Sequence, residues 1–214
     1  MRKLLVLAVL VAVLLVGDLA ARSAAESAVE KGVRAKVSGV ASVDAQIHSF
    51  PFTGRLLGQG KVSTLDLRLT DVTGHGIDVA WLRMETKGLE LDRSVLFGGK
   101  VRIKHVDSVT VTANISQDQV SKATGAQVEL LDGGKARITY KGVTATADVA
   151  VVDGSMRFTA AGLPALTVPL PDSDLLPCAV DATVVQGAVL ASCTADHLPA
   201  IVVRAVGTVD LQAP

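Results

Sequence analysis

The sequence has 214 residues, of which 49% are hydrophobic and 20% charged, enough apolar material for one or two domains with a sizeable core. Twenty-one Lys and Arg balance 21 Asp and Glu, so no net positive charge draws the chain to nucleic acid, and we expect no nucleic-acid partner. Aromatic residues make up only 3% of the chain, while Val, Ala and Thr recur throughout. This composition favours β-structure packed from small side chains.

The N-terminal residues have the layout of an export signal. Two basic residues precede an uncharged apolar run at 4–16, and Asp18 interrupts the apolar stretch that follows. A membrane span needs about 20 apolar residues, a length that this stretch reaches only by including Asp18. Residues 1–21 are therefore either a cleaved signal peptide or an N-terminal membrane anchor formed by residues 4–21. Both alternatives place residues 22–214, predicted to form a single domain, in the extracytoplasmic cell envelope.

The segment after the apolar run predicts an amphipathic helix. Apolar residues recur at every fourth position, namely Ala21, Ala25, Val29, Val33 and Val37. Ser38-Gly39 then provides a stop, because glycine readily takes the left-handed conformation that ends a helix.

From residue 43 the apolar period changes to two residues, which predicts β-strands. The alternating runs are 43–47, 65–69, 77–84, 100–106, 108–115, 127–131, 136–140, 143–151, 156–160 and two arms around Gln186-Gly187. Ser116 and Gln119 form a capping-box pattern that predicts a short helix ending at Gly125. Four prolines at 163–177 predict a surface loop or edge connection. The fold class is α+β, with a leading helix packed against a long, curved antiparallel sheet.

No common catalytic pattern is present: the chain lacks a Gly-x-Ser-x-Gly elbow, a His-Glu-x-x-His helix and both glycine-rich phosphate-binding motifs. Asp196 and His197 are neighbours, and neighbours in a strand point to opposite faces, so we expect no acid/base couple there. Asp71, His75 and Asp78 fit an exposed turn better than a metal site. We therefore expect a protein that is not an enzyme and has no cofactor and no metal.

Two cysteines, Cys178 and Cys193, flank the two arms around Gln186-Gly187. In an oxidising compartment, a hairpin there brings the sulfurs together as a disulfide. The alternative is a pair of free, buried thiols.

Two further features each have a lipid-contact interpretation and an ordinary structural one. Alternation places Lys100, Arg102 and Lys104 on one strand face, where they attract anionic headgroups or else form an ordinary solvated face. A Pro/Gly-rich segment at 49–58 concentrates Phe50, Phe52, Leu56 and Leu57, and Leu96-Phe97 is a shorter segment of the same kind. Apolar loops pack under other elements, line a ligand entrance or touch a membrane.

The exported leader, the helix, Phe50-Pro51-Phe52 with Leu56-Leu57-Gly58 and the strand Val62 to Leu69 resemble the LmeA-like phospholipid-binding family of actinobacterial cell-envelope proteins. The Pro-led hairpin from Leu176-Pro177 to His197 resembles the ending of that family. The resemblance covers most of the chain after the leader and is sharpest at Phe-Pro-Phe. It implies an elongated antiparallel barrel wrapped on a helix, similar to one half of a tubular (BPI-like) lipid-binding protein. It also implies a bound phospholipid and a role in maintaining envelope glycolipids, but assigns no role to the cysteines.

The sequence thus predicts an exported phospholipid-binding or lipid-transfer protein that works at a membrane surface. A helix and sheet with few bulky aromatics leave an apolar groove, and apolar grooves bind acyl chains. The predicted acyl-chain residues are Phe50, Phe52, Leu56, Leu57, Val29, Val33, Leu96 and Phe97, and the predicted headgroup residues are Lys100, Arg102 and Lys104. The alternatives are a structural or scaffold protein of the envelope and a hydrolase of lipid-linked glycans.

Overall fold

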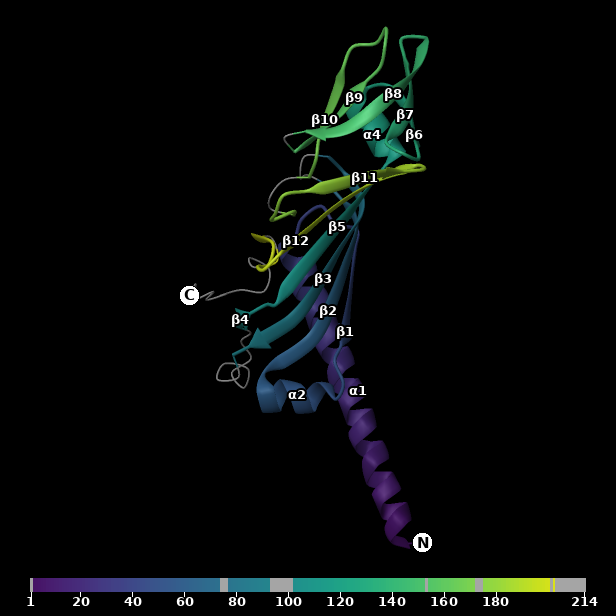
Figure 1. Cartoon of the computed structure of the whole chain (residues 1–214). Coiled ribbons are helices and arrows are strands. Elements are labelled where there is room, and N and C mark those ends of the chain that lie inside the picture. The colour runs from purple at the N-terminus through teal and green to yellow at the C-terminus, as the bar shows by residue number, and fades with distance from the viewer. Residues whose placement is uncertain are drawn as a thin grey trace.

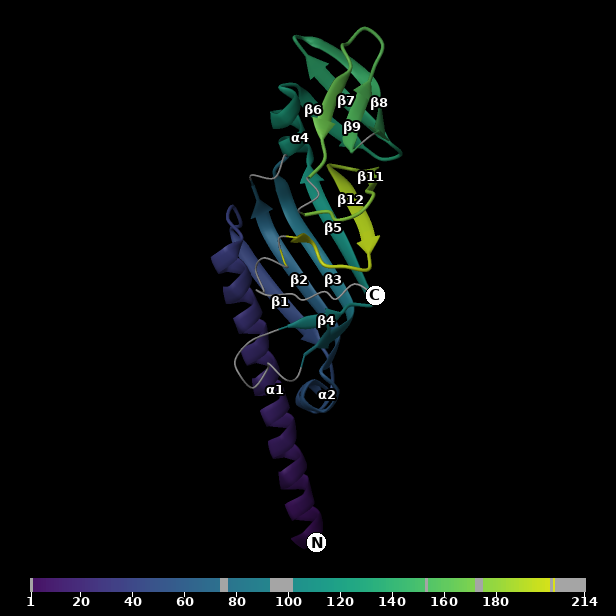
Figure 2. The ribbon, with the colours of Figure 1, turned by 90° about the vertical axis from the view of Figure 1, so that its left-hand side faces the viewer.

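The structure is a computed structural model that describes residues 2–73, 77–92, 102–152, 154–171, 175–200 and 202, with side chains described from residue 12 onward. The molecule is elongated: two antiparallel sheets follow one another along its length, and a long N-terminal helix lies along the first of them (Figures 1 and 2). This arrangement confirms the α+β class with a leading helix.

The first sheet is curved and has the strand order β1-β2-β3-β5-β12-β11, with β4 paired to β3. All its pairings are antiparallel. Its strands are β1 (Ser42–His48), β2 (Lys61–Val72), β3 (Val79–Leu91), β4 (Ile103–His105), β5 (Ser108–Ser116), β11 (Asp181–Val185) and β12 (Ala188–Ala195). In β1 and β5, every second side chain is buried, as the two-residue period predicts.

The helix α1 (Arg2–Lys36) is continuous and packs along β1. The predicted apolar stripe is confirmed, because Val33 and Val37 are buried while Ala21, Ala25 and Val29 are partly buried against the same core. Polar contacts hold the helix to the sheet edge. Glu26 Oε1 accepts a hydrogen bond of 2.8 Å from the backbone N–H of Ile47, and Glu30 Oε1 accepts one of 3.2 Å from Ala45. The helix therefore covers the free edge of β1, and the sheet and helix form a half-barrel.

The second sheet has the order β10-β9-β8-β7-β6. Its strands are β6 (Gln127–Leu131), β7 (Lys135–Tyr140), β8 (Val143–Val152), β9 (Ser155–Thr159) and β10 (Leu166–Pro169). The short helix α4 (Gln117–Thr124) contacts β6 and β10. The β11–β12 hairpin joins the two sheets, because Gly187 N donates a hydrogen bond of 3.1 Å to the Leu130 carbonyl.

Most predicted elements are confirmed to within a few residues. Both halves of the capping box at α4 are present: Gln119 N donates to Ser116 Oγ, and Ser116 N donates to Gln119 Oε1. Two predictions need correction. The segment at 163–177, predicted as a surface loop or edge connection, contains the edge strand β10, but it is not a surface loop, because it buries Val168, Leu170, Leu175 and Leu176. Pro169 is tolerated there since β10 is an edge strand.

The second correction concerns the apolar segment at 49–58, most of which is a helix and not a loop. The helix α2 (Phe52–Gln59) begins after Pro51 and ends at Gly60, whose φ of 71° is left-handed. The predicted strand at 100–106 is reduced to β4 in the described residues, and residues 100 and 101 lie outside them. The likeness to half of a tubular lipid-binding protein stays a prediction.

Candidate functional site

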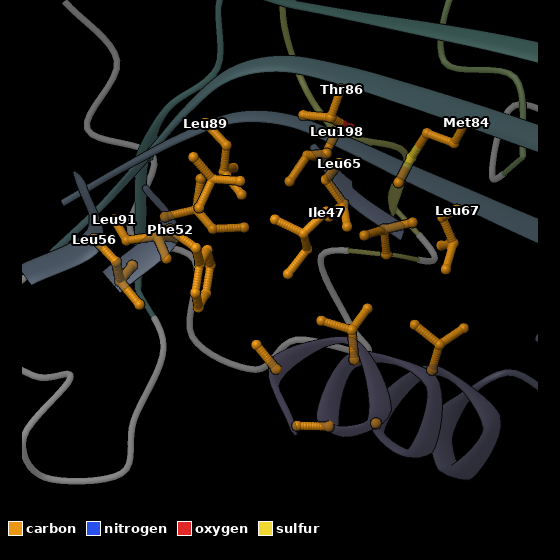
Figure 3. Close-up of a pocket in the computed structure, with 18 residues that line it drawn as sticks. Ile47, Phe52, Leu56, Leu65, Leu67, Met84, Thr86, Leu89, Leu91 and Leu198 are labelled. Carbon is orange, nitrogen blue, oxygen red and sulfur yellow. The ribbon is translucent and has the colours of Figure 1, made fainter. Parts of the chain in front are cut away.

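A cavity of about 360 Å³ lies between α1 and the concave face of the first sheet (Figure 3). Its volume falls within the range of ordinary small-molecule pockets, about 300–1,000 Å³. Eighteen residues are drawn around it. They come from α1, α2, four strands and the chain after β12: Ala25, Ala28, Val29, Gly32, Val33, Ile47, Phe52, Leu56, Val62, Leu65, Leu67, Met84, Thr86, Leu89, Leu91, Ile103, Leu198 and Val202. Thr86 is the only one of these with a polar side chain.

The cavity is open because small residues of α1 face large apolar residues of the sheet. Ala25, Ala28 and Gly32 lie on the helical side. A Cβ placed on Gly32 would meet no atom within 4 Å, so the space beside this residue is empty of protein. A wall of this kind buries hydrocarbon and offers almost nothing to a polar ligand.

One end of the cavity is formed by α2, which a carboxylate of α1 holds in place. Asp18 Oδ2 accepts a hydrogen bond of 2.9 Å from the backbone N–H of Phe52, and Asp18 Oδ1 accepts one of 2.6 Å from Thr53. The Thr53 hydroxyl also donates to Asp18 Oδ1. Pro51, at the N-cap position, makes no side-chain cap, so Asp18 supplies the acceptor that the N-terminus of α2 needs.

These hydrogen bonds lower the pKa of the Asp18 carboxyl below its ordinary value. The Thr53 hydroxyl makes the largest contribution to this shift, followed by the backbone N–H groups of Thr53 and Phe52. The sequence pattern shows Asp18 only as an interruption of an apolar run. Its partners lie more than 30 residues further along the chain, and no short-range period signals them.

The structure brings four of the predicted acyl-chain residues together in the cavity wall: Val29, Val33, Phe52 and Leu56. It does not bring Phe50 and Leu57 there; these side chains are 66% and 51% exposed. Consecutive residues of a helix are rotated by about 100°, so Leu57 faces away from the cavity that Leu56 lines. Phe50 instead lines a second pocket with Leu14 and Leu15 of α1. Leu96 and Phe97 lie outside the described residues.

The predicted basic residues have a carboxylate between them. Arg102 Nη1 and Lys104 Nζ each lie 3.7 Å from an oxygen of Asp92, which is buried. Asp92 therefore offsets part of their charge. Ile103, between the two, lines the cavity, as alternation along β4 requires. Lys100 lies outside the described residues.

Cys178 and Cys193 are joined by a disulfide with a Cα–Cα distance of 5.7 Å. Cys193 lies on β12, and Cys178 precedes β11, so the bridge ties the chain before the hairpin to its second strand. Leu198, a few residues beyond Cys193, reaches the cavity wall.

Asp196 and His197 do touch, contrary to the expectation from strand geometry. His197 Nδ1 lies 2.9 Å from Asp196 Oδ1, and this contact lowers the pKa of the Asp196 carboxyl. The two residues follow the end of β12 at Ala195, so strand alternation does not govern them. The described part of the chain holds no group of three or more His, Cys, Asp or Glu arranged to bind a metal ion. Within the same residues, no helix combines the length and hydropathy that a membrane span requires.

The chain thus has the architecture of a half-barrel closed by a helix around a cavity whose described wall suits an apolar ligand. The model of the LmeA-like phospholipid-binding family matches residues 16–202, and the chain belongs to this family. Searches of curated proteins and of solved structures find no match.

Sequence reasoning missed most of the cavity wall, because the wall is made by the sheet. Ile47, Leu65, Leu67, Met84 and Leu89 all point inward from β1, β2 and β3. Their alternation was visible in the sequence, but alternation marks a buried face without showing whether another element fills the space against it.

Proposed function

We propose that this protein binds a phospholipid by taking an acyl chain into the cavity between α1 and the first sheet, and that it catalyses no reaction. The observation that carries this proposal is the cavity itself, of about 360 Å³ and walled almost entirely by apolar side chains. Membership of a phospholipid-binding family supports it independently.

The energetics are sufficient for a useful affinity. Each acyl methylene moved from water into an apolar site contributes about 0.8 kcal/mol. Roughly fifteen such groups contribute about 12 kcal/mol, which gives micromolar binding once an association cost of about 4 kcal/mol is subtracted. In this proposal Val29, Val33, Phe52 and Leu56 contact the chain, and the inward residues of the sheet complete the site.

We further propose that lipid enters and leaves at the α2 end while that end touches a membrane surface. Phe50 and Leu57 are exposed there, and α1 continues beyond α2 with exposed Leu14, Leu15 and Leu19 (Figure 1). Exposed apolar side chains grouped in this way favour contact with a lipid surface. Arg102 and Lys104, with Lys100, would then meet anionic headgroups.

The proposed location is the extracytoplasmic cell envelope, reached by export through residues 1–21. The disulfide between Cys178 and Cys193 supports this location, because disulfides persist in oxidising compartments. Transfer of phospholipid in support of envelope glycolipids is the role we propose there.

The central experiment compares two neighbouring leucines. Leu56→Asp places a carboxylate in the cavity wall, whereas Leu57→Asp places the same group on the exposed side of α2. We expect both proteins to fold, as judged by circular dichroism and melting curves, and only Leu56→Asp to lose the phospholipid that organic solvent extracts from the wild type. The proposal is contradicted if the wild-type protein never yields lipid. It is also contradicted if Leu56→Asp yields as much phospholipid as the wild type. A lipid-free wild type would favour the scaffold alternative.

Membrane contact is tested with vesicles. Phe50→Ser should reduce binding of the purified protein to phospholipid vesicles in a flotation assay. Val143→Ser is the matched control, because Val143 is also an exposed apolar side chain but lies on β8 of the second sheet. Equal binding by the two variants would place the membrane contact elsewhere on the molecule.

A further inference from the structure

Thr86 is the one polar side chain in the described wall of the cavity, and it comes from the middle of β3. The residue is 0% exposed. Its Oγ1 has no hydrogen-bond partner among the described residues. Figure 3 shows Thr86 above the cavity, between Leu89 and Met84 along the wall.

A hydroxyl in this position costs the free protein stability. A buried donor without an acceptor loses its hydrogen bonds to water and gains nothing in return. The neighbours of Thr86 across the sheet are Leu65 on β2 and Val109 on β5, and both are apolar. Valine has the same branched shape, suits a strand equally well and carries no such cost. Packing therefore does not explain why the position holds threonine.

A ligand oxygen in the cavity would satisfy the hydroxyl. A phosphate is a poor fit for the described part of the wall, because no Lys or Arg is among the described residues that line it, and burying an unpaired charge is expensive. Ester carbonyls are the neutral acceptors of a phospholipid that join directly to its hydrocarbon chains. The free-energy cost of moving an ester carbonyl oxygen into an apolar cavity is small when it accepts a hydrogen bond from an otherwise unpaired donor there.

We propose that the Thr86 hydroxyl donates a hydrogen bond to an ester carbonyl oxygen of the bound phospholipid and thereby sets the depth to which the lipid enters. This inference rests on the proposed function. The acyl chain attached to that ester then occupies the apolar cavity beside Thr86, and the charged headgroup stays outside the apolar wall.

The test compares two lipids that differ only in the acceptor. Diacyl phosphatidylglycerol carries ester carbonyls, and dialkyl phosphatidylglycerol of the same chain length has ether oxygens in their place. In an equimolar competition read by native mass spectrometry, wild-type protein should favour the diacyl lipid by about five-fold, the ratio that one neutral hydrogen bond of ordinary strength supplies. Thr86→Val should remove the preference, and Thr86→Ser should retain it.

Ser49→Ala is the matched control. Ser49 Oγ is also buried without a hydrogen-bond partner among the described residues, but Ser49 does not line the cavity. Its loss should leave the lipid preference unchanged. Thr86→Val should melt at the temperature of the lipid-free wild type or above it, which shows that any effect on binding is not unfolding.

The outcomes separate the two proposals. Wild type that binds both lipids equally, or Thr86→Val that keeps the wild-type preference, overturns the role of Thr86 while phospholipid binding stands. Wild type that binds neither lipid overturns both.

Discussion

The two sheets of this molecule differ in how the large side chains on their buried faces are packed. In the second sheet, the large side chains Leu130, Ile138, Met156 and Phe158 are all fully buried, and none of them lines the cavity described above. In the first sheet, large side chains of the strands face Ala25, Ala28 and Gly32 of α1, and a cavity remains. We call the first sheet with α1 the open half of the molecule. Protein interiors are normally close-packed, so the open half lacks packing contacts that a ligand in the cavity can supply.

The helices that cover the two sheets, α4 and α1, also differ in how they are held. The helix α4 contributes Val120, fully buried, to the core it covers. The helix α1 is fixed to β1 partly by Glu26 and Glu30, whose carboxylates accept backbone hydrogen bonds from the strand edge. Edge contacts of this kind hold a helix in place without filling the space beneath its middle. A ligand site can thus arise where polar contacts at the edge of a sheet help to hold a helix that core packing holds elsewhere.

The largest predicted effect comes from the same substitution in each half. Leu130→Ala in the second sheet should lower the free energy of unfolding of the lipid-free protein by an amount near the upper end of the usual range, about 2–5 kcal/mol. Leu67→Ala in the first sheet should cost an amount near the lower end, because one side of Leu67 already faces the cavity. The two residues are 0% and 1% exposed, so burial does not explain a difference. Equal losses in urea unfolding would show that the cavity is closed in solution.

Reduction of the disulfide tests the open half as a whole. The bridge between Cys178 and Cys193 closes a loop with a sequence separation of 15 and should contribute about 3 kcal/mol to stability. We expect reduction to lower the melting temperature, and the intact mass of the unreduced protein to be lighter by two hydrogen atoms. Quantitative alkylation of both thiols without reductant would contradict this.

Filling the cavity should convert the open half into a closed one. Gly32→Ala should stabilise α1 by about 0.5–1 kcal/mol through helix propensity alone. Gly32→Leu should also occupy the cavity and reduce the lipid extracted from the purified protein. Gly17→Leu is the control, because a Cβ on Gly17 also meets no atom within 4 Å, yet Gly17 does not line the cavity. Full lipid loading of Gly32→Leu would show that the ligand lies elsewhere.

The contact between α1 and α2 should respond to acid. Because the pKa of Asp18 is lowered in the folded protein, its stabilising contribution is complete well above the ordinary value of 3.8 and is lost as the pH falls through the lowered pKa. Asp18→Asn should therefore melt below the wild type at about pH 6, and the difference should shrink below about pH 4. Melting curves across this range measure it. A constant difference would mean that the carboxylate charge does not matter.

The smallest effect is expected from the basic residues. Changing Lys100, Arg102 and Lys104 to Gln should weaken binding to anionic vesicles only, and added salt should mimic the change, since exposed charges are screened over about 8 Å at physiological ionic strength. Asp92 already offsets part of the charge of Arg102 and Lys104. The control is Lys135→Gln with Arg137→Gln, two exposed cations of the second sheet that also pair with carboxylates. The same loss of vesicle binding in both variants would show that the basic residues beside β4 have no special role in membrane contact.

Local patterns in the sequence predicted much of the fold. The two-residue period located β5 through β9 closely, and the Ser116 and Gln119 pair located α4, because each of these signals depends on residues near one another in the chain. The same reasoning treated residues 49–58 as a loop. Pro51 and two glycines obscured α2, a helix whose N-terminal acceptor comes from Asp18, far away in the sequence.

The candidate site was predicted in part for the same reason. Val29 and Val33 followed from the helical stripe, and Phe52 and Leu56 from an unusual density of apolar residues. Thr86 could not be found, because a single threonine in a strand is unremarkable until its neighbours and its missing partner are known. An inward residue lines a cavity only if the element packed against it leaves space there. Only the tertiary contacts show this.

The hydrogen bonds of Asp18 place part of the proposed export signal, residues 1–21, in contact with one end of the cavity. A peptidase that cuts after residue 21 detaches this carboxylate from the helix it caps, whereas a cut before residue 18 leaves it in place. Since α2 presents Phe52 and Leu56 to the cavity, the position of such a cut decides how firmly one end of the cavity is held. Under the proposed export and lipid binding, one side chain would therefore link the site of cleavage to the capacity for ligand.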